Sequence, residues 1–196
     1  MAAPRKLTDD LLLDKAAGVF ARRGYDGTAI PDLLAELGVS RPTLYAHARS
    51  KRSLVEAIHR KVVAYYQELL PRMLRADDPP VVRLRQLVAV QVRATRELGD
   101  CLVVALNALP ELADEPALQA WWRELDDTLR EILVQARRDG SLPADLDLTV
   151  ARRAIWAVLN DLPHWYREGA LSPEALTGQL VRLFTGGFAR GPGPDG

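Results

Sequence analysis

The chain has 196 residues, of which 48% are hydrophobic and 27% are charged. This composition is typical of a globular protein and excludes a disordered or fibrous chain, and the length suits one domain of ordinary size or two small ones. The 26 Lys and Arg residues balance the 26 Asp and Glu residues. Taken alone, that balance argues against a polybasic tail that binds nucleic acid.

The zero net charge hides two segments of opposite sign. Residues 1–61 contain 11 Lys and Arg against 7 Asp and Glu, whereas residues 62–196 contain 15 against 19. Within residues 41–61, six basic side chains stand against the single acidic residue Glu56. A basic head is therefore followed by an acidic body, and we expect any contact with nucleic acid to lie in the head.

Helical spacing of apolar residues runs along the whole sequence, without an alternating strand pattern, and predicts an all-α protein of about nine helices. Thr8, Thr28, Ser50 and Ser172 are expected to cap helices, and Gly24 and Gly38 to end them. Pro163 is expected to kink the eighth helix. In chain order, the predicted helices cover about 9–23, 29–37, 41–47, 51–75, 81–98, 101–109, 117–139, 148–168 and 173–188.

Residues 28–47 read as a short helix, a turn at Gly38 and a second short helix. Leu33, Leu37, Val39 and Leu44 are spaced to close a small core that holds the two helices at a fixed angle, which is the geometry of a helix-turn-helix. A glycine between two short helices also occurs in helical proteins that do not bind DNA. The position of this pair in the basic head favours DNA binding.

The same residues resemble the DNA-binding head of the tetracycline-repressor (TetR) family. The resemblance rests on Thr28-Ala-Ile-Pro-Asp-Leu-Leu-Ala-Glu-Leu-Gly-Val-Ser40, Arg41-Pro-Thr-Leu-Tyr-Ala-His47 and Ser50-Lys-Arg-Ser-Leu54, and on the upstream segment from Ala17 to Thr28. Two residues depart from the family pattern, Ala48 where Phe is usual and Leu34 where a small Ala is usual. Both concern the packing of the head.

The resemblance implies a homodimeric repressor that binds a palindromic double-stranded DNA operator and is released when a small hydrophobic or amphipathic effector binds the body. It implies a three-helix head over residues 1–50 and a ligand-binding and dimerisation body over 51–190. The Gly- and Pro-rich composition of residues 191–196 predicts a disordered tail. Such a regulator would work in the bacterial cytoplasm, at the nucleoid when bound. The predicted DNA contacts are Thr28, Ser40, Arg41, Thr43, Tyr45, His47 and Lys51, with base contacts expected from Arg41 and Thr43.

The body is expected to hold an effector pocket and a dimer interface. The pocket candidates are Tyr65, Tyr66, Leu69, Gln91, Leu106, Trp121, Trp122, Leu125 and Asn160, although most of these side chains are equally well explained as core. The last two helices carry the dimer candidates Ala151, Ile155, Val158, Leu162, Leu180, Leu183 and Phe184, and the alternative is that these apolar stripes pack inside one chain.

An enzyme without a recognisable motif, or a helical ligand-binding or adaptor protein, is the alternative function. The histidines are scattered, with His59 expected on the exposed side of a long helix, and no metal site or cofactor is predicted. Cys101, the single cysteine, is expected to be a small core residue in a reducing compartment. The longest apolar run is shorter than the roughly 20 residues that cross a bilayer, so we expect no membrane contact.

Overall fold

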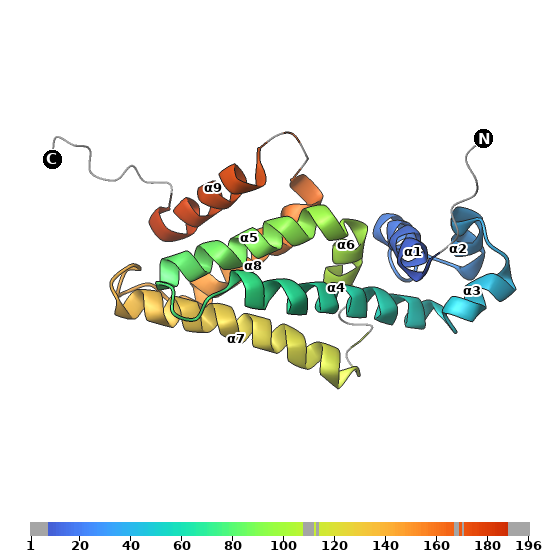
Figure 1. The fold of residues 1–196 in the computed structure, drawn as a ribbon, viewed down its shortest axis with the longest axis horizontal. Helices are drawn as coiled ribbons and strands as arrows, with labels where there is room; N and C mark the ends of the chain where they lie inside the picture. Colours follow the sequence, from blue (N-terminus) through green and yellow to red (C-terminus); the bar gives the residue numbers. More distant parts are fainter. Residues whose placement is uncertain (1–7, 108–111, 113, 167–168, 170, 188–196) are drawn as a thin grey trace. The chain divides into compact units, whose positions relative to one another are not determined.

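The computed structural model describes residues 8–107, 112, 114–166, 169 and 171–187, and within them the chain is all-α (Figure 1). The predicted tail over 191–196 lies outside the described residues. The described part of the chain forms nine helices, as predicted. They are α1 (Asp9–Arg23), α2 (Ile30–Leu37), α3 (Arg41–His47), α4 (Lys51–Met73), α5 (Pro80–Leu98), α6 (Asp100–Asn107), α7 (Pro116–Arg138), α8 (Leu148–Trp165) and α9 (Pro173–Gly186).

Most of the predicted helix ends are confirmed by local hydrogen bonds. The Thr8 side chain accepts a hydrogen bond from the Leu11 N–H at the start of α1, and the Ser172 side chain accepts one from the Ala175 N–H at the start of α9. The Ser53 N–H donates to Ser50 Oγ over 3.0 Å at the start of α4. Gly38 ends α2 with φ 66° and ψ 35°, a left-handed conformation that glycine adopts without strain.

Two predictions at helix ends are wrong. Thr28 does not cap α2, because the N-cap is Ala29, whose N–H donates to Asp32 Oδ2 over 2.9 Å, and the Thr28 hydroxyl instead donates back to the Gly24 carbonyl over 2.7 Å. The eighth helix ends at Trp165, three residues before the predicted end. Pro163 lies inside its last turn, and the Tyr166 hydroxyl donates to the Leu171 carbonyl, which anchors the chain as it leaves the helix.

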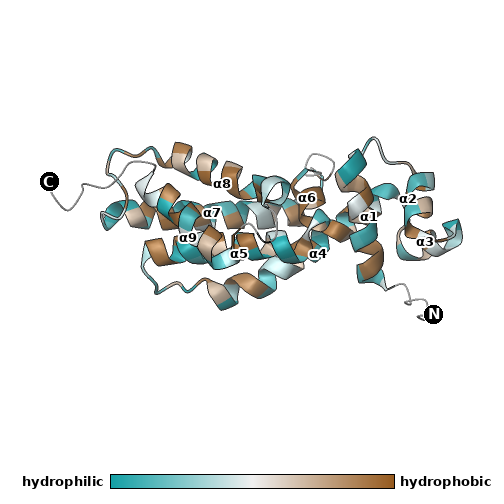
Figure 2. Cartoon of the chain, turned by 90° about the horizontal axis from the view of Figure 1, so that it is seen from above, coloured by the Kyte–Doolittle hydropathy of each residue, from teal (hydrophilic) through white to brown (hydrophobic). Residues whose placement is uncertain are grey.

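The chain divides into two compact units. The first contains the described part of residues 1–65 and 98–119, and the second that of residues 66–97 and 120–196. In the first unit, α1 packs against α2 and α6. Hydrophobic and hydrophilic residues alternate around the helices, as the brown and teal segments in Figure 2 show. The domain boundary after residue 50 stays a prediction.

The two departures of the head from the family pattern lie at packed positions. Ala48, where the family usually has Phe, is the residue that ends α3, and it is only 7% exposed. Leu34, where a small residue is usual, is half-buried on α2. A small residue in one buried place and a larger one nearby in sequence are consistent with a change in how the head fills its core.

Candidate nucleic-acid interface

Helices α2 and α3 form the predicted helix-turn-helix. The N–H groups of Gly38 and Val39 both donate to the Leu34 carbonyl, over 3.0 and 3.3 Å, so the turn closes directly on the end of α2. Leu33, Leu37 and Leu44 are buried and join the two helices through one small core, and Val39 is half-buried. This core leaves the opposite face of α3 exposed to solvent.

The exposed face of α3 carries the predicted base-contacting residues. Arg41, Thr43 and Tyr45 are all exposed, whereas Leu44 between them is buried. Ser40 caps the helix, with its Oγ accepting from the Thr43 N–H and lying 2.8 Å from Thr43 Oγ1. Within the described residues, the side chains of Arg41 and Tyr45 have no hydrogen-bond or ion-pair partner. They are therefore available to an external ligand.

Three other predicted contact residues already have partners inside the first unit. Lys51 Nζ donates to the carbonyls of Tyr25 and Thr28 over 2.7 and 3.1 Å, and lies 4.1 Å from the centroid of the Tyr25 ring. His47 Nδ1 pairs with Asp9 Oδ1, which links the end of α3 to the start of α1. Thr28 is 1% exposed. These residues hold the head together, whatever contact they make with DNA.

The basic residues that follow α3 divide into paired and unpaired groups. Arg52 pairs with Glu56, Asp114 and Glu115, and the carboxylates of Asp114 and Glu56 raise the pKa of its guanidinium above its ordinary value. Lys61 pairs with Asp14 over 2.6 Å and with Asp10 over 3.5 Å. Arg49 and Arg60 are exposed and have no such partner among the residues that the structure describes. Because nearby carboxylates offset their charge, Arg52 and Lys61 contribute less than Arg49 and Arg60 to the electrostatic attraction of DNA phosphates.

The prediction for His59 is wrong, because this histidine is buried. His59 lies on α4 with 0% of its surface exposed. Desolvation lowers its pKa to about 4, and this effect outweighs the backbone hydrogen bonds at Val55 and Ala105, which raise the pKa. Cys101 is 1% exposed, and burial followed by the hydrogen bond to Asp14 raises the pKa of its thiol to about 12. A thiol in this state is a core residue, as predicted, and not a nucleophile.

Four of the predicted pocket residues form a packed aromatic and polar cluster in the second unit. The Tyr66 hydroxyl donates to Gln91 Oε1, and Gln91 Nε2 donates to the Leu159 carbonyl over 3.3 Å. The Trp121 ring lies 5.3 Å from the Tyr66 ring and 4.8 Å from the Trp122 ring, centroid to centroid. Gln91 therefore satisfies buried polar groups, which fits the alternative that these pocket candidates are core residues.

The remaining pocket candidates lie in different places. Leu125 and Asn160 line a cavity of about 210 Å³ together with Asp126, Trp156 and Trp122, which also belongs to the aromatic cluster. Asp126 pairs with Arg152 and accepts from Trp156 Nε1 over 2.9 Å, a link between α7 and α8 that helical spacing did not reveal. Leu69 is buried, and Tyr65 and Leu106, which belong to the first unit, are half-buried.

The dimer candidates on α8 and α9 differ in burial. Ile155, Leu162 and Leu180 are at most 5% exposed in the single chain, so they are core residues of one protomer. The other four are half-buried and retain surface for a partner; they are Ala151, Val158, Leu183 and Phe184. The sequence pattern identified the apolar stripes but did not separate these two groups.

The described residues contain neither a candidate metal site nor a candidate membrane span. No group of three or more His, Cys, Asp and Glu side chains among them is placed to hold a metal ion. None of the described helices combines the length and the hydropathy that a membrane span requires.

Comparison with known proteins identifies the family. Residues 12–58 match the model of bacterial regulatory proteins of the tetR family, and residues 77–188 match that of a tetracyclin repressor-like C-terminal domain. The HTH-type transcriptional repressor KstR2 of Mycolicibacterium smegmatis is 27% identical over 188 residues, which cover 94% of this chain and 92% of that protein.

Solved structures share the fold over nearly the whole chain. A TetR-family transcriptional regulator from Bordetella parapertussis is similar with a TM-score of 0.81 and 29% identity, covering 92% of this chain and 95% of its own. AibR, solved in complex with isovaleryl coenzyme A and operator DNA, is similar in fold with a TM-score of 0.77 at 23% identity, covering 90% and 97%. The exposed face of α3, the matched models and these relatives agree, and the chain belongs to the tetR family of bacterial transcriptional regulators.

Proposed function

We propose that the protein is a ligand-responsive transcriptional repressor that binds a palindromic operator as a homodimer and is released by a small-molecule effector. The observation that carries the proposal is the exposed face of α3, where Arg41 and Tyr45 have no partner among the described residues. KstR2 of M. smegmatis is named a repressor, and AibR was solved with both operator DNA and a coenzyme A thioester.

The exposed residues of α3 suit a reading of the major groove. Arg41 can donate two hydrogen bonds to O6 and N7 of a guanine, and the Thr43 methyl group can contact a thymine methyl. The Tyr45 hydroxyl can donate to a phosphate, which fixes the position of the helix without reading sequence. Ser40, His47, Lys51 and Thr28 support this surface from within the head, and any phosphate contact that they make is secondary.

The second unit supplies dimerisation and effector binding. The half-buried residues of α8 and α9 provide apolar surface for a two-fold contact between copies of the chain. A small hydrophobic or amphipathic effector would act by preferring the conformation in which the two heads no longer fit successive major grooves, about 34–36 Å apart. The regulator would work in the bacterial cytoplasm, and no catalytic step is assigned to it.

The decisive experiment measures binding of the purified protein to the DNA upstream of its own gene and to a random duplex of equal length, by fluorescence anisotropy. Arg41→Ala is expected to weaken the specific complex by about 1–3 kcal/mol and to affect the random duplex less. Arg49→Ala is the matched control, since Arg49 is exposed and follows α3. It is expected to weaken both complexes alike and to reduce their salt dependence.

Two results would contradict the proposal. Absence of sequence-specific binding to the upstream DNA at low and at moderate salt would remove its basis. An equal loss at both duplexes for Arg41→Ala would show that Arg41 contacts phosphate and does not read a base.

A further inference from the structure

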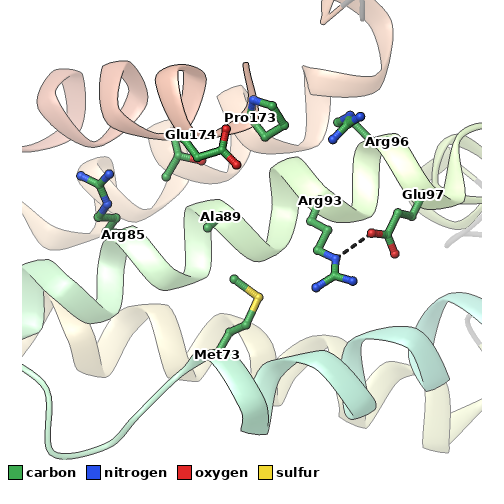
Figure 3. A pocket seen from close by; sticks show the side chains of 9 residues that line it. Met73, Arg85, Ala89, Arg93, Arg96, Glu97, Pro173 and Glu174 are labelled. Carbon is green, nitrogen blue, oxygen red and sulfur yellow. Dashed lines mark hydrogen bonds and ion pairs between the residues drawn. The ribbon is translucent and has the colours of Figure 1, made fainter. Parts of the chain in front are cut away.

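The second unit contains a groove along α5 that the sequence did not indicate. It has a volume of about 410 Å³ and lies between the end of α4, one side of α5 and the start of α9 (Figure 3). This volume is in the range of sites that hold small organic ligands. The aromatic cluster of Tyr66, Trp121 and Trp122, which the sequence favoured as a pocket, is not part of its lining.

Three arginines make the groove cationic. Arg85, Ala89, Arg93 and Arg96 all line it, and their spacing of four, four and three residues places them on one side of α5. Figure 3 shows Ala89 between Arg85 at one end and Arg93 and Arg96 at the other. Two of the described residues that line the groove are acidic: Glu97, which accepts from Arg93 Nε over 2.7 Å, and Glu174.

This local excess of positive charge runs against its surroundings. Residues 62–196 as a whole contain 15 Lys and Arg against 19 Asp and Glu. A groove lined by three guanidinium groups in an acidic part of the chain concentrates anions relative to the remaining surface. Guanidinium groups also offer paired donors that match the geometry of carboxylate and phosphate oxygens.

Apolar side chains from three helices lie across the middle of the groove, beside the carboxylate of Glu174 (Figure 3). Met73 lies on the α4 side and Pro173 on the α9 side, and Ala89 lies between them on α5 (Figure 3). Thr177 of α9 also lines the groove and is only 4% exposed, so it adds a buried hydroxyl beside this apolar surface. The lining therefore suits a ligand with an anionic group and an apolar portion.

We propose that this groove binds an amphipathic organic anion, with a carboxylate or phosphate held by Arg85 or Arg96 and an apolar chain lying over Ala89 and Met73. The proposal rests on the proposed function, because it gives the chemical class of the effector and its place in the second unit. It separates the effector site from the buried Tyr66–Gln91 cluster, which then has a structural role.

The test is isothermal titration calorimetry of the full-length protein with octyl phosphate and octanoate, which share an apolar chain and differ in the anionic group. Octanol and inorganic phosphate are the control ligands, each lacking one half of the proposed ligand. The double variant Arg85→Gln/Arg96→Gln is expected to weaken binding of octyl phosphate or octanoate about tenfold or more, because it removes the charged hydrogen-bond donors that hold the anionic group. Arg72→Gln is the matched control, since Arg72 is exposed on α4 and pairs with Glu68 outside the groove.

A second variant tests the position of the apolar chain without removing charge. Ala89→Phe is expected to fill the middle of the groove and to weaken binding at least as much as the arginine changes, while thermal melting checks that each variant is folded. The proposal is overturned if neither amphipathic anion binds at millimolar concentration, if inorganic phosphate or octanol binds as well as they do, or if both groove variants bind like the Arg72→Gln control.

Operator binding measured in parallel separates the two proposals. Release of the operator by octyl phosphate or octanoate in the wild type, with loss of that release in Arg85→Gln/Arg96→Gln, supports the effector role. Ligand binding that leaves the operator complex intact at saturation overturns the effector role. Absence of any specific operator complex contradicts the proposed function, and the calorimetry still decides whether the groove is an anion site.

Discussion

Lowering the pH from 7 to 5 is expected to destabilise the folded protein through His59. This side chain is buried on α4, and desolvation lowers its pKa from 6.5 to about 4. Between these two values the unfolded chain binds a proton at His59 and the folded chain does not. The free energy of unfolding therefore rises with pH in this window, and the loss grows as the pH falls from 6.5 towards 4.

The size of the effect follows from the two pKa values. One pKa unit corresponds to about 1.36 kcal/mol, so the full contribution of His59 below pH 4 is about 3 kcal/mol. Between pH 7 and pH 5, where the unfolded histidine becomes largely protonated and the folded one does not, the loss is about 2 kcal/mol. This is a sizeable fraction of the roughly 5–15 kcal/mol that stabilises an ordinary domain.

The measurement is urea denaturation at pH 7 and pH 5, at one fixed protein concentration, for the wild type, His59→Gln and His164→Gln. His164 is exposed and pairs with Asp161, so its substitution is the matched control for removing a histidine. The difference in unfolding free energy between the two pH values is expected to shrink by about 2 kcal/mol in His59→Gln only. The same pH dependence in the wild type and in His59→Gln would refute the assignment.

Two further predictions concern the first unit. Alkylation of Cys101 by iodoacetamide at pH 8 is expected to be about a hundredfold or more slower in the folded protein than in urea. The reason is that the thiol is buried and its pKa is raised to about 12. Similar alkylation rates in both states would show that this thiol is accessible. Lys51→Met is expected to lower the free energy of unfolding without DNA by about 1–3 kcal/mol, through loss of two hydrogen bonds and the contact with the Tyr25 ring. Lys15→Met, on an exposed position of α1, is the control, and equal melting of the two variants would contradict the structural role of Lys51.

Local chemistry made much of the fold predictable from the sequence. Thr8, Ser172 and Gly38 mark helix ends because a side-chain oxygen or a left-handed glycine satisfies backbone groups only a few residues away. Thr28 was wrongly predicted as the cap because it stands two residues before a short helix and next to the true N-cap, Ala29. Its hydroxyl had a second acceptor in the Gly24 carbonyl, and the choice between the two depends on how the loop folds.

Burial was harder to predict because it depends on which helix covers a given face. The spacing of His59 on α4 defines a helix face, but nothing in that spacing indicates that the face is buried. The same limit applies to Ile155 and Val158 on α8, which belong to one apolar stripe although only Ile155 is covered within the chain. The groove along α5 was missed because its lining comes from three segments that are far apart in the sequence. The spacing of arginines on α5 does not reveal which residues of α4 and α9 face them.

The charge of the head also changes meaning once the side-chain partners are known. Six basic side chains lie within residues 41–61, but Lys51 serves the backbone of the head, Arg52 is surrounded by three carboxylates, and Lys61 is held by Asp10 and Asp14. Each of these would have to give up its partner before it neutralised a phosphate, whereas Arg41 and Arg49 are ready to do so. The electrostatic part of operator binding should therefore follow the few unpaired arginines near α3, while the other basic residues hold that helix in the position from which it can read DNA.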